Sequence, residues 1–73
     1  MMIEIDWQRV VLNLRSETGL AVATIATKVQ SNEQHLNRIA RGEVKEPKFT
    51  VGHRLLDMHY DVMGDRHKEA LNN

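Results

Sequence analysis

Apolar residues recur at helical spacing in four separate stretches of the chain, and polar or turn-forming residues divide these stretches. The first stripe repeats at i, i+3, i+4 and i+7 and comprises Trp7, Val10, Val11 and Leu14. Asp6 before it is a candidate N-cap, and Gly19 after it is a candidate C-cap because glycine adopts left-handed backbone angles without steric cost. The pattern therefore predicts a first helix over residues 7–18. Residues 3–6 alternate apolar and acidic side chains and predict a short extended arm before this helix.

Two short helices are predicted next, on either side of a polar break at residues 30–32. The apolar positions of this stretch are Ile25, Ala26, Val29, Leu36 and Ile39. We expect the earlier helix over residues 22–29, although Ala21 gives it no side-chain cap, which forgoes about 1 kcal/mol. The later helix, at about residues 33–41, has Asn32 as its N-cap and Gly42 as its stop.

The rest of the sequence predicts a connector, a fourth helix and a tail. Pro47 disfavours helix at the residue before it, so residues 43–48 are expected to form an extended connector whose far end is anchored by Phe49. A fourth helix then begins near Thr50 and ends near Gly64. Residues 65–73 are polar apart from two apolar positions, and we expect a frayed helical turn or a disordered, mobile tail there.

Length and composition are those expected of one small intracellular domain. A chain of 73 residues buries only about 60% of its unfolded surface, so its core is small and a partner subunit would add stability. The sequence contains no cysteine, which excludes disulfides and thiolate metal sites and fits a reducing cytoplasm. No apolar run approaches about 18 residues, and no basic segment precedes an apolar one at the start, so we expect neither a membrane span nor a signal peptide.

Charge is balanced over the whole chain but not along it. Ten lysines and arginines oppose ten aspartates and glutamates, and this zero net charge weakens the electrostatic case for a nucleic-acid partner. Residues 15–54, however, hold seven basic against four acidic side chains. The positive part of the chain is thus the part that contains the two short helices.

This ordered pattern resembles the lambda-repressor-like helix-turn-helix regulators of phages and bacteria, also called Cro/CI or Xre-type regulators, and in particular their small phage or prophage members. The matching residues are Gly19, Leu20, Ile25, Ala26, Leu36, Ile39, Ala40, Arg41 and Gly42, followed by the segment 42–49 with its Pro47 and Phe49. The resemblance covers about residues 6–60. It implies an all-α fold in one domain over residues 1–73, a compact bundle of four or five helices whose third helix enters the major groove of DNA.

The resemblance also implies which side chains contact DNA. The expected base-reading residues are Glu33, Gln34 and Arg38. Asn37, a further hydrogen-bonding residue on the same helical face, is counted with them. Phosphate contacts are expected from Arg15, Asn32, Arg41, Lys45 and Lys48. The same polar face would also suit an ordinary solvated surface. The connector lysines are interleaved with Glu43 and Glu46, as in a solvent-exposed loop that makes no DNA contact. Gln30 stands where the family usually has a glycine, so we expect it to take a left-handed conformation at a cost of about 1 kcal/mol, or to widen the turn.

The fourth helix carries more apolar residues than one buried face needs, which favours a homodimer contact over additional core positions. The expected interface residues are Leu56, Met58, Tyr60 and Met63. A single helix-turn-helix reads only half of an operator, so the family pattern also implies a twofold partner about 34 Å away along the duplex.

Other chemistry has little support in the sequence. The histidines at 35, 53, 59 and 67 include no pair at i, i+3 or i, i+4, so no metal site or other cofactor is expected. No catalytic motif appears and so small a helical chain leaves little room for a substrate cleft, so we expect neither an enzyme nor a small-molecule substrate. Two hypotheses remain. One is a repressor-like transcriptional regulator that binds double-stranded operator DNA as a homodimer in the cytoplasm of a bacterial host, and the other is a protein-binding adaptor or antitoxin-like partner on the same fold.

Overall fold

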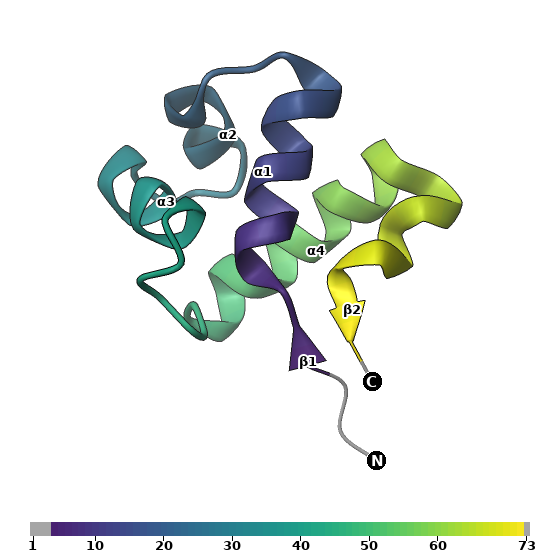
Figure 1. The fold of residues 1–73 in the computed structure, drawn as a ribbon. Coiled ribbons are helices and arrows are strands. Elements are labelled where there is room, and N and C mark those ends of the chain that lie inside the picture. The colour runs from purple at the N-terminus through teal and green to yellow at the C-terminus, as the bar shows by residue number, and fades with distance from the viewer. Residues whose placement is uncertain (1–3, 73) are drawn as a thin grey trace.

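Four α-helices follow one another in residues 4–72, the part of the chain that a computed structural model describes (Figure 1). They are α1 (Trp7–Thr18), α2 (Val22–Lys28), α3 (Glu33–Ala40) and α4 (Phe49–Met63), and a 3-10 helix, η1 (Gly64–Ala70), comes after them. Two short strands, β1 (Glu4–Ile5) and β2 (Leu71–Asn72), pair the two ends of the described chain. The expected helical bundle is confirmed with four α-helices in this range, whereas the strand pair was not predicted.

The limits of α1 follow from its two caps. The Asp6 side chain accepts a hydrogen bond from the backbone N–H of Arg9 at 3.0 Å, which satisfies one of the free donors at the helix start. At the other end Gly19 is left-handed, with φ at 71°, and its N–H donates to the carbonyl of Arg15 at 2.9 Å. The sequence prediction for this helix is confirmed at both ends.

Both α2 and α3 end in a Schellman motif, in which a left-handed residue after the helix turns the chain back. After α2 this residue is Gln30, with φ at 57°, and the next N–H, that of Ser31, donates to the third-last helix carbonyl at 2.8 Å. After α3 it is Gly42, with φ at 78°, and the N–H of Glu43 donates to the carbonyl of Arg38 at 2.9 Å. The left-handed alternative expected for Gln30 is therefore the one adopted.

The core lies around α1, which packs against both α3 and α4 (Figure 1). The buried positions of the first stripe, Val10, Val11 and Leu14, have no exposed surface, and the apolar residues of α2 and α3 pack against them. Trp7 is half-buried at the start of the stripe and lies against α4 at Gly52, where an added Cβ would stand 3.0 Å from the ring carbon Cη2. A side chain at this position would require the Trp7 ring to shift by a few tenths of an ångström.

The buried face of α4 is defined by residues four apart. Val51, Leu55, His59 and Met63 are all at most 9% exposed. Phe49 precedes Val51 by two residues, which is about 200° around a helix, so its ring points to solvent and is 84% exposed. The expectation that Phe49 anchors the connector is therefore wrong.

Residues 65–72, for which a frayed turn or a disordered tail was expected, lie in η1 and β2, while residue 73 lies outside the described residues. Ala70 is fully buried, and its carbonyl accepts the N–H of Asp6 at 2.8 Å. The antiparallel pair places Ile5 opposite Leu71, so the extended arm is confirmed for residues 4–5, while residue 3 lies outside the described residues. Within residues 4–72, no helix has the length and apolar character needed to cross a membrane.

Candidate functional site

The exposed face of α3 collects the polar side chains that the sequence singled out. Leu36 and Ile39 point into the core and have no exposed surface, which orients the rest of this short helix. The base-reading candidates on the other faces are Glu33, Gln34 and Arg38, all exposed, and Asn37, which is half-buried. The structure thus gathers the expected residues on one accessible helix.

Local contacts fix both ends of this helix. The side-chain oxygen of Asn32 accepts the N–H of His35 at 2.8 Å, as its predicted role as N-cap requires. This bond occupies the oxygen and leaves the amide NH₂ of Asn32 available to an outside acceptor. At the C-terminal end, Gln8 on α1 donates through its Nε2 to the carbonyl of Ala40 at 2.9 Å. The face is therefore held in place from the core side and from both ends.

Glu43 pairs with Arg38 and Arg41, two of the three candidate arginines, which the sequence analysis did not predict. Its carboxylate lies 2.6 Å from Nε of Arg41 and 3.8 Å from Nε of Arg38. The hydrogen bond from Arg41 holds the pKa of the Glu43 carboxyl below its usual range, and the same bond raises the pKa of Arg41. Gly42 was the sequence signal for these ion pairs, because a left-handed turn at this glycine brings the side chain of Glu43 back over the last turn of α3.

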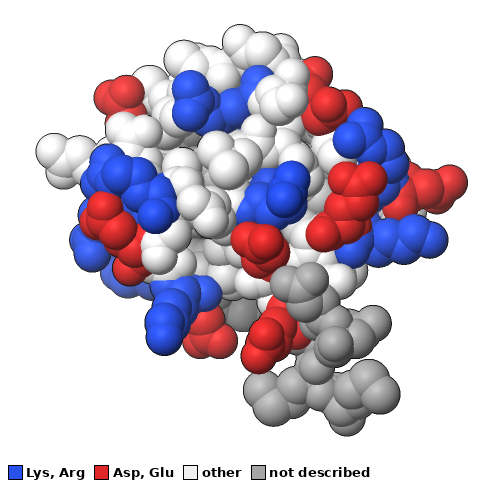
Figure 2. All heavy atoms as spheres, in the orientation of Figure 1, with Lys and Arg blue, Asp and Glu red and all other residues white. Residues whose placement is uncertain are grey.

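The remaining phosphate candidates come from other parts of the chain. Lys45 and Lys48 are exposed on the connector that follows α3, and Arg15 is exposed on α1. On the face that Figure 2 shows, lysine and arginine groups lie next to aspartate and glutamate groups rather than in one continuous basic region. Electrostatic attraction for a polyanion is accordingly local, not a property of the whole surface.

The dimer candidates on α4 are not equally accessible. Met63 is only 7% exposed, because it lies on the buried face, so it has little surface to offer a second subunit. Leu56 and Met58 are half-buried and pack against the core. Tyr60, at 62% exposed, is the one of the four that presents most of its side chain to solvent.

An open groove of about 1090 Å³ lies where the start of α1, the connector and the start of α4 meet. Trp7, Pro47 and Leu56 contribute apolar lining, and the exposed ring of Phe49 stands at the groove, stacked on His53 with ring centroids 6.0 Å apart. The sequence analysis missed this surface because it expected Phe49 to anchor the far end of the connector.

His59 is fully buried, and both of its ring nitrogens have partners. Nε2 lies 3.1 Å from the side-chain nitrogen of Asn13, and Nδ1 lies 2.7 Å from Nδ1 of His67. Burial lowers the pKa of His59, and the neighbouring His67 lowers it further. Within residues 4–72, no group of three or more histidine, aspartate or glutamate side chains is placed to hold a metal ion.

The chain was compared with protein-family models, with curated proteins and with solved structures, and none of the three comparisons found a match.

Proposed function

We propose that this chain is a sequence-specific, repressor-like transcriptional regulator that inserts α3 into the major groove of operator DNA as a homodimer. The observation that carries the proposal is the exposed polar face of α3, a short helix joined to α2 by a tight turn and seated on the core by Leu36 and Ile39. This arrangement fits a helix-turn-helix, in which the first helix supports the second and the second reads the groove.

The exposed side chains of α3 suit direct readout of base edges. Gln34 can pair with adenine through its amide, Arg38 can pair with guanine through its guanidinium, and Glu33 can accept from the cytosine amino group. Each such contact discriminates against a wrong base by about 1–3 kcal/mol. Asn37 is half-buried, so it has the least freedom of the base-reading candidates.

Phosphate contacts in this proposal include an exchange of partners. Glu43 accepts a hydrogen bond from Nε of Arg41 and lies near Nε of Arg38, so it competes with bases and phosphates for these two side chains. Both ion pairs are exposed, and exposed pairs contribute little to stability, so a phosphate can replace the carboxylate. Asn32, Lys45, Lys48 and Arg15 complete the phosphate set and do not need the same exchange.

The homodimer in this proposal follows from the geometry of operators, because one recognition helix covers only a half-site. Of the four candidate residues on α4, Tyr60 has the most surface available for such a contact. A tyrosine suits this role since its ring buries a large area while its hydroxyl stays hydrogen-bonded.

Selection of bound fragments from random DNA by the wild type, Gln34→Ala and Arg38→Ala tests the proposal. We expect each variant to lose preference at one operator position while still binding DNA of mixed sequence, because phosphate contacts remain. Lys68→Ala, on the distant η1, is the matched control for an exposed side chain and should leave the preference unchanged. An unaltered preference in both α3 variants would refute the assignment of α3.

A protein-binding role, as an adaptor or antitoxin-like partner, is the second candidate. The observation that favours it is the exposed ring of Phe49 beside an open groove, together with zero net charge. Binding isotherms with mixed DNA at two salt concentrations separate the candidates, because a DNA binder loses affinity steeply as salt rises. Absent or salt-insensitive binding would favour the protein partner.

A further inference from the structure

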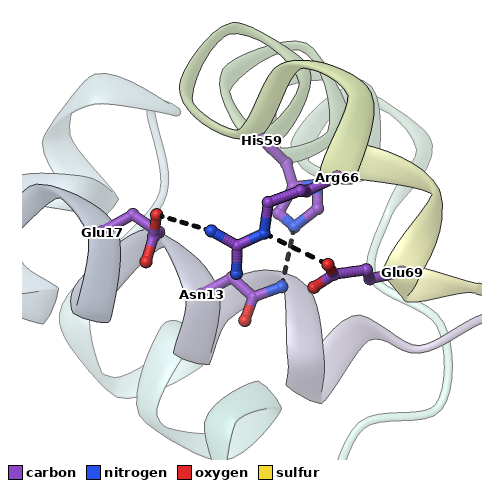
Figure 3. A network of polar contacts seen from close by, with 5 residues as sticks. All are labelled: Asn13, Glu17, His59, Arg66 and Glu69. Atoms are coloured by element: carbon purple, nitrogen blue, oxygen red, sulfur yellow. Dashed lines mark hydrogen bonds and ion pairs between the residues drawn. The ribbon is translucent and has the colours of Figure 1, made fainter.

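Two imidazole rings and an amide join three elements at the far end of α4. His59 on α4 lies between Asn13 on α1 and His67 on η1, and Figure 3 shows the ring of His59 with the Asn13 side chain beneath it. The contact between the two histidine Nδ1 atoms, at 2.7 Å, is short enough that one of these atoms must donate a proton to the other. We call Asn13, His59 and His67 the histidine clasp.

The hydrogen bonds of the clasp fix where its protons lie. The amide nitrogen of Asn13 can only donate, so Nε2 of His59 accepts and carries no proton. A neutral His59 must then carry its proton on Nδ1 and donate it to Nδ1 of His67. His67 in turn holds its own proton on Nε2. Both rings are neutral in this arrangement.

The clasp has room for one additional proton and no more. With one extra proton, His67 is positively charged and donates from Nδ1 to Nδ1 of His59. The proton of His59 then lies on Nε2, and the Asn13 amide turns so that its oxygen accepts a hydrogen bond from this Nε2–H. With a second extra proton both Nδ1 atoms carry hydrogen, and no lone pair remains between them. Two positive rings would then face each other across a contact closed to water on the His59 side.

We propose that the histidine clasp is a proton-operated release for the C-terminal segment: acidification doubly protonates both rings and detaches η1 and β2 from α1 and β1. Burial of His59 supports this proposal, because it lowers the pKa of that ring and so opposes the charged form while the clasp is closed.

Charged and aromatic groups around the clasp modulate the release without replacing it. Arg66 on η1 bridges Glu17 of α1, at 3.2 Å, and Glu69 of η1, at 3.1 Å (Figure 3). Tyr60 of α4 meets the edge of the His67 ring, with centroids 5.4 Å apart. Of these groups, Glu69 opposes the lowering of the His59 pKa, because its negative charge favours the charged ring.

The segment that would be released includes buried backbone and side-chain surface. Ala70 has no exposed surface, and its carbonyl accepts the N–H of Asp6 at 2.8 Å. This bond joins the two ends of the described chain beside the strand pair of Ile5 and Leu71. The amide proton of Asp6 is therefore a direct reporter of whether the C-terminal segment is attached.

Amide hydrogen exchange, read by NMR at about pH 7.5 and about pH 5.5, tests the clasp. We expect the protection factor of Asp6 to fall at least about tenfold at the lower pH, and to fall clearly more than that of Leu36 in the core. At the higher pH the ring ¹⁵N signals should show His59 protonated on Nδ1. A parallel fall at Asp6 and Leu36, no fall at Asp6, or a proton on Nε2 of His59 at the higher pH would each overturn the proposal.

Two variants complete the experiment. His67→Gln removes the second ring of the clasp and leaves the buried His59, so the fall in Asp6 protection at the lower pH should be smaller than in the wild type. His53→Gln is the matched control, because His53 lies exposed on α4 near Asp57 and outside the clasp, and it should keep the wild-type response. A pH response of undiminished size in His67→Gln would refute the clasp.

Discussion

Gln30 offers the most direct test of how the chain turns between α2 and α3. Its φ of 57° lies in the left-handed region, so its backbone is strained, and its side chain is exposed. A substitution can therefore relieve the backbone strain while removing few packing contacts. The left-handed conformation costs an L-residue about 1–2 kcal/mol, and glycine avoids this cost but gives up about 0.5–1 kcal/mol in unfolded-state entropy. We therefore expect Gln30→Gly to raise the free energy of unfolding by about 0.5–1 kcal/mol.

Urea denaturation followed by circular dichroism measures this change. The midpoint should rise at constant m-value, and the melting temperature should rise by about 2–8 °C for a domain of this size. Gln30→Ala is the matched control, because it removes the same side chain but keeps the Cβ that causes the strain, and it should not stabilise the fold. If glycine proves no more stable than alanine at this position, strain at Gln30 is not a feature of the turn and the reasoning fails.

Three further predictions concern the α3 cap, the buried histidine and the arginine pairs. Asn32→Ala should lower the free energy of unfolding by about 1 kcal/mol in thermal denaturation, because the His35 N–H loses its acceptor, while Asn32→Ser should retain most of the stability. The pKa of His59 is lowered in the folded state, so the unfolded chain binds more protons than the folded chain below about pH 6.5. The free energy of unfolding should therefore be at its full value above that pH and should fall as the pH drops toward the folded-state pKa of His59. Urea midpoints that do not change between about pH 7.5 and about pH 5.5 would contradict this. Glu43→Gln should tighten DNA binding a few-fold in fluorescence anisotropy by freeing Arg38 and Arg41, and it should do so more than Glu46→Gln, which removes an equal charge from the same connector.

The helices were predictable because their signals are local. The stripe of α1, its cap at Asp6 and its stop at Gly19 lie within one short segment, and the structure begins and ends the helix where they indicate. The same holds for α3, whose cap at Asn32 and stop at Gly42 need no information from elsewhere in the chain. Local hydrogen bonds decide these positions, and sequence spacing records local hydrogen bonds well.

The C-terminal segment was not predictable because its partners are distant in the sequence. Ala70 is buried through contact with the start of the chain, and β2 exists only because β1 pairs with it. His59 and His67 were missed for a related reason, since the spacing rule for histidines applies within one helix, and α4 ends at Met63 before the chain folds back. Phe49 was misassigned because hydrophobicity alone does not tell which side of α4 a residue occupies.

The candidate DNA-binding face depends on tertiary structure more than on α3 itself. A helix of eight residues is too short to be stable alone in water, so α3 keeps its shape through Leu36 and Ile39 in the core and through the bond from Gln8 to Ala40. In the proposed complex, the position of Gln34 relative to a base edge is therefore set partly by α1. Gln8 is not among the proposed DNA contacts. A substitution that removes its side-chain donor should nevertheless weaken sequence discrimination by α3, although every side chain of α3 is unchanged.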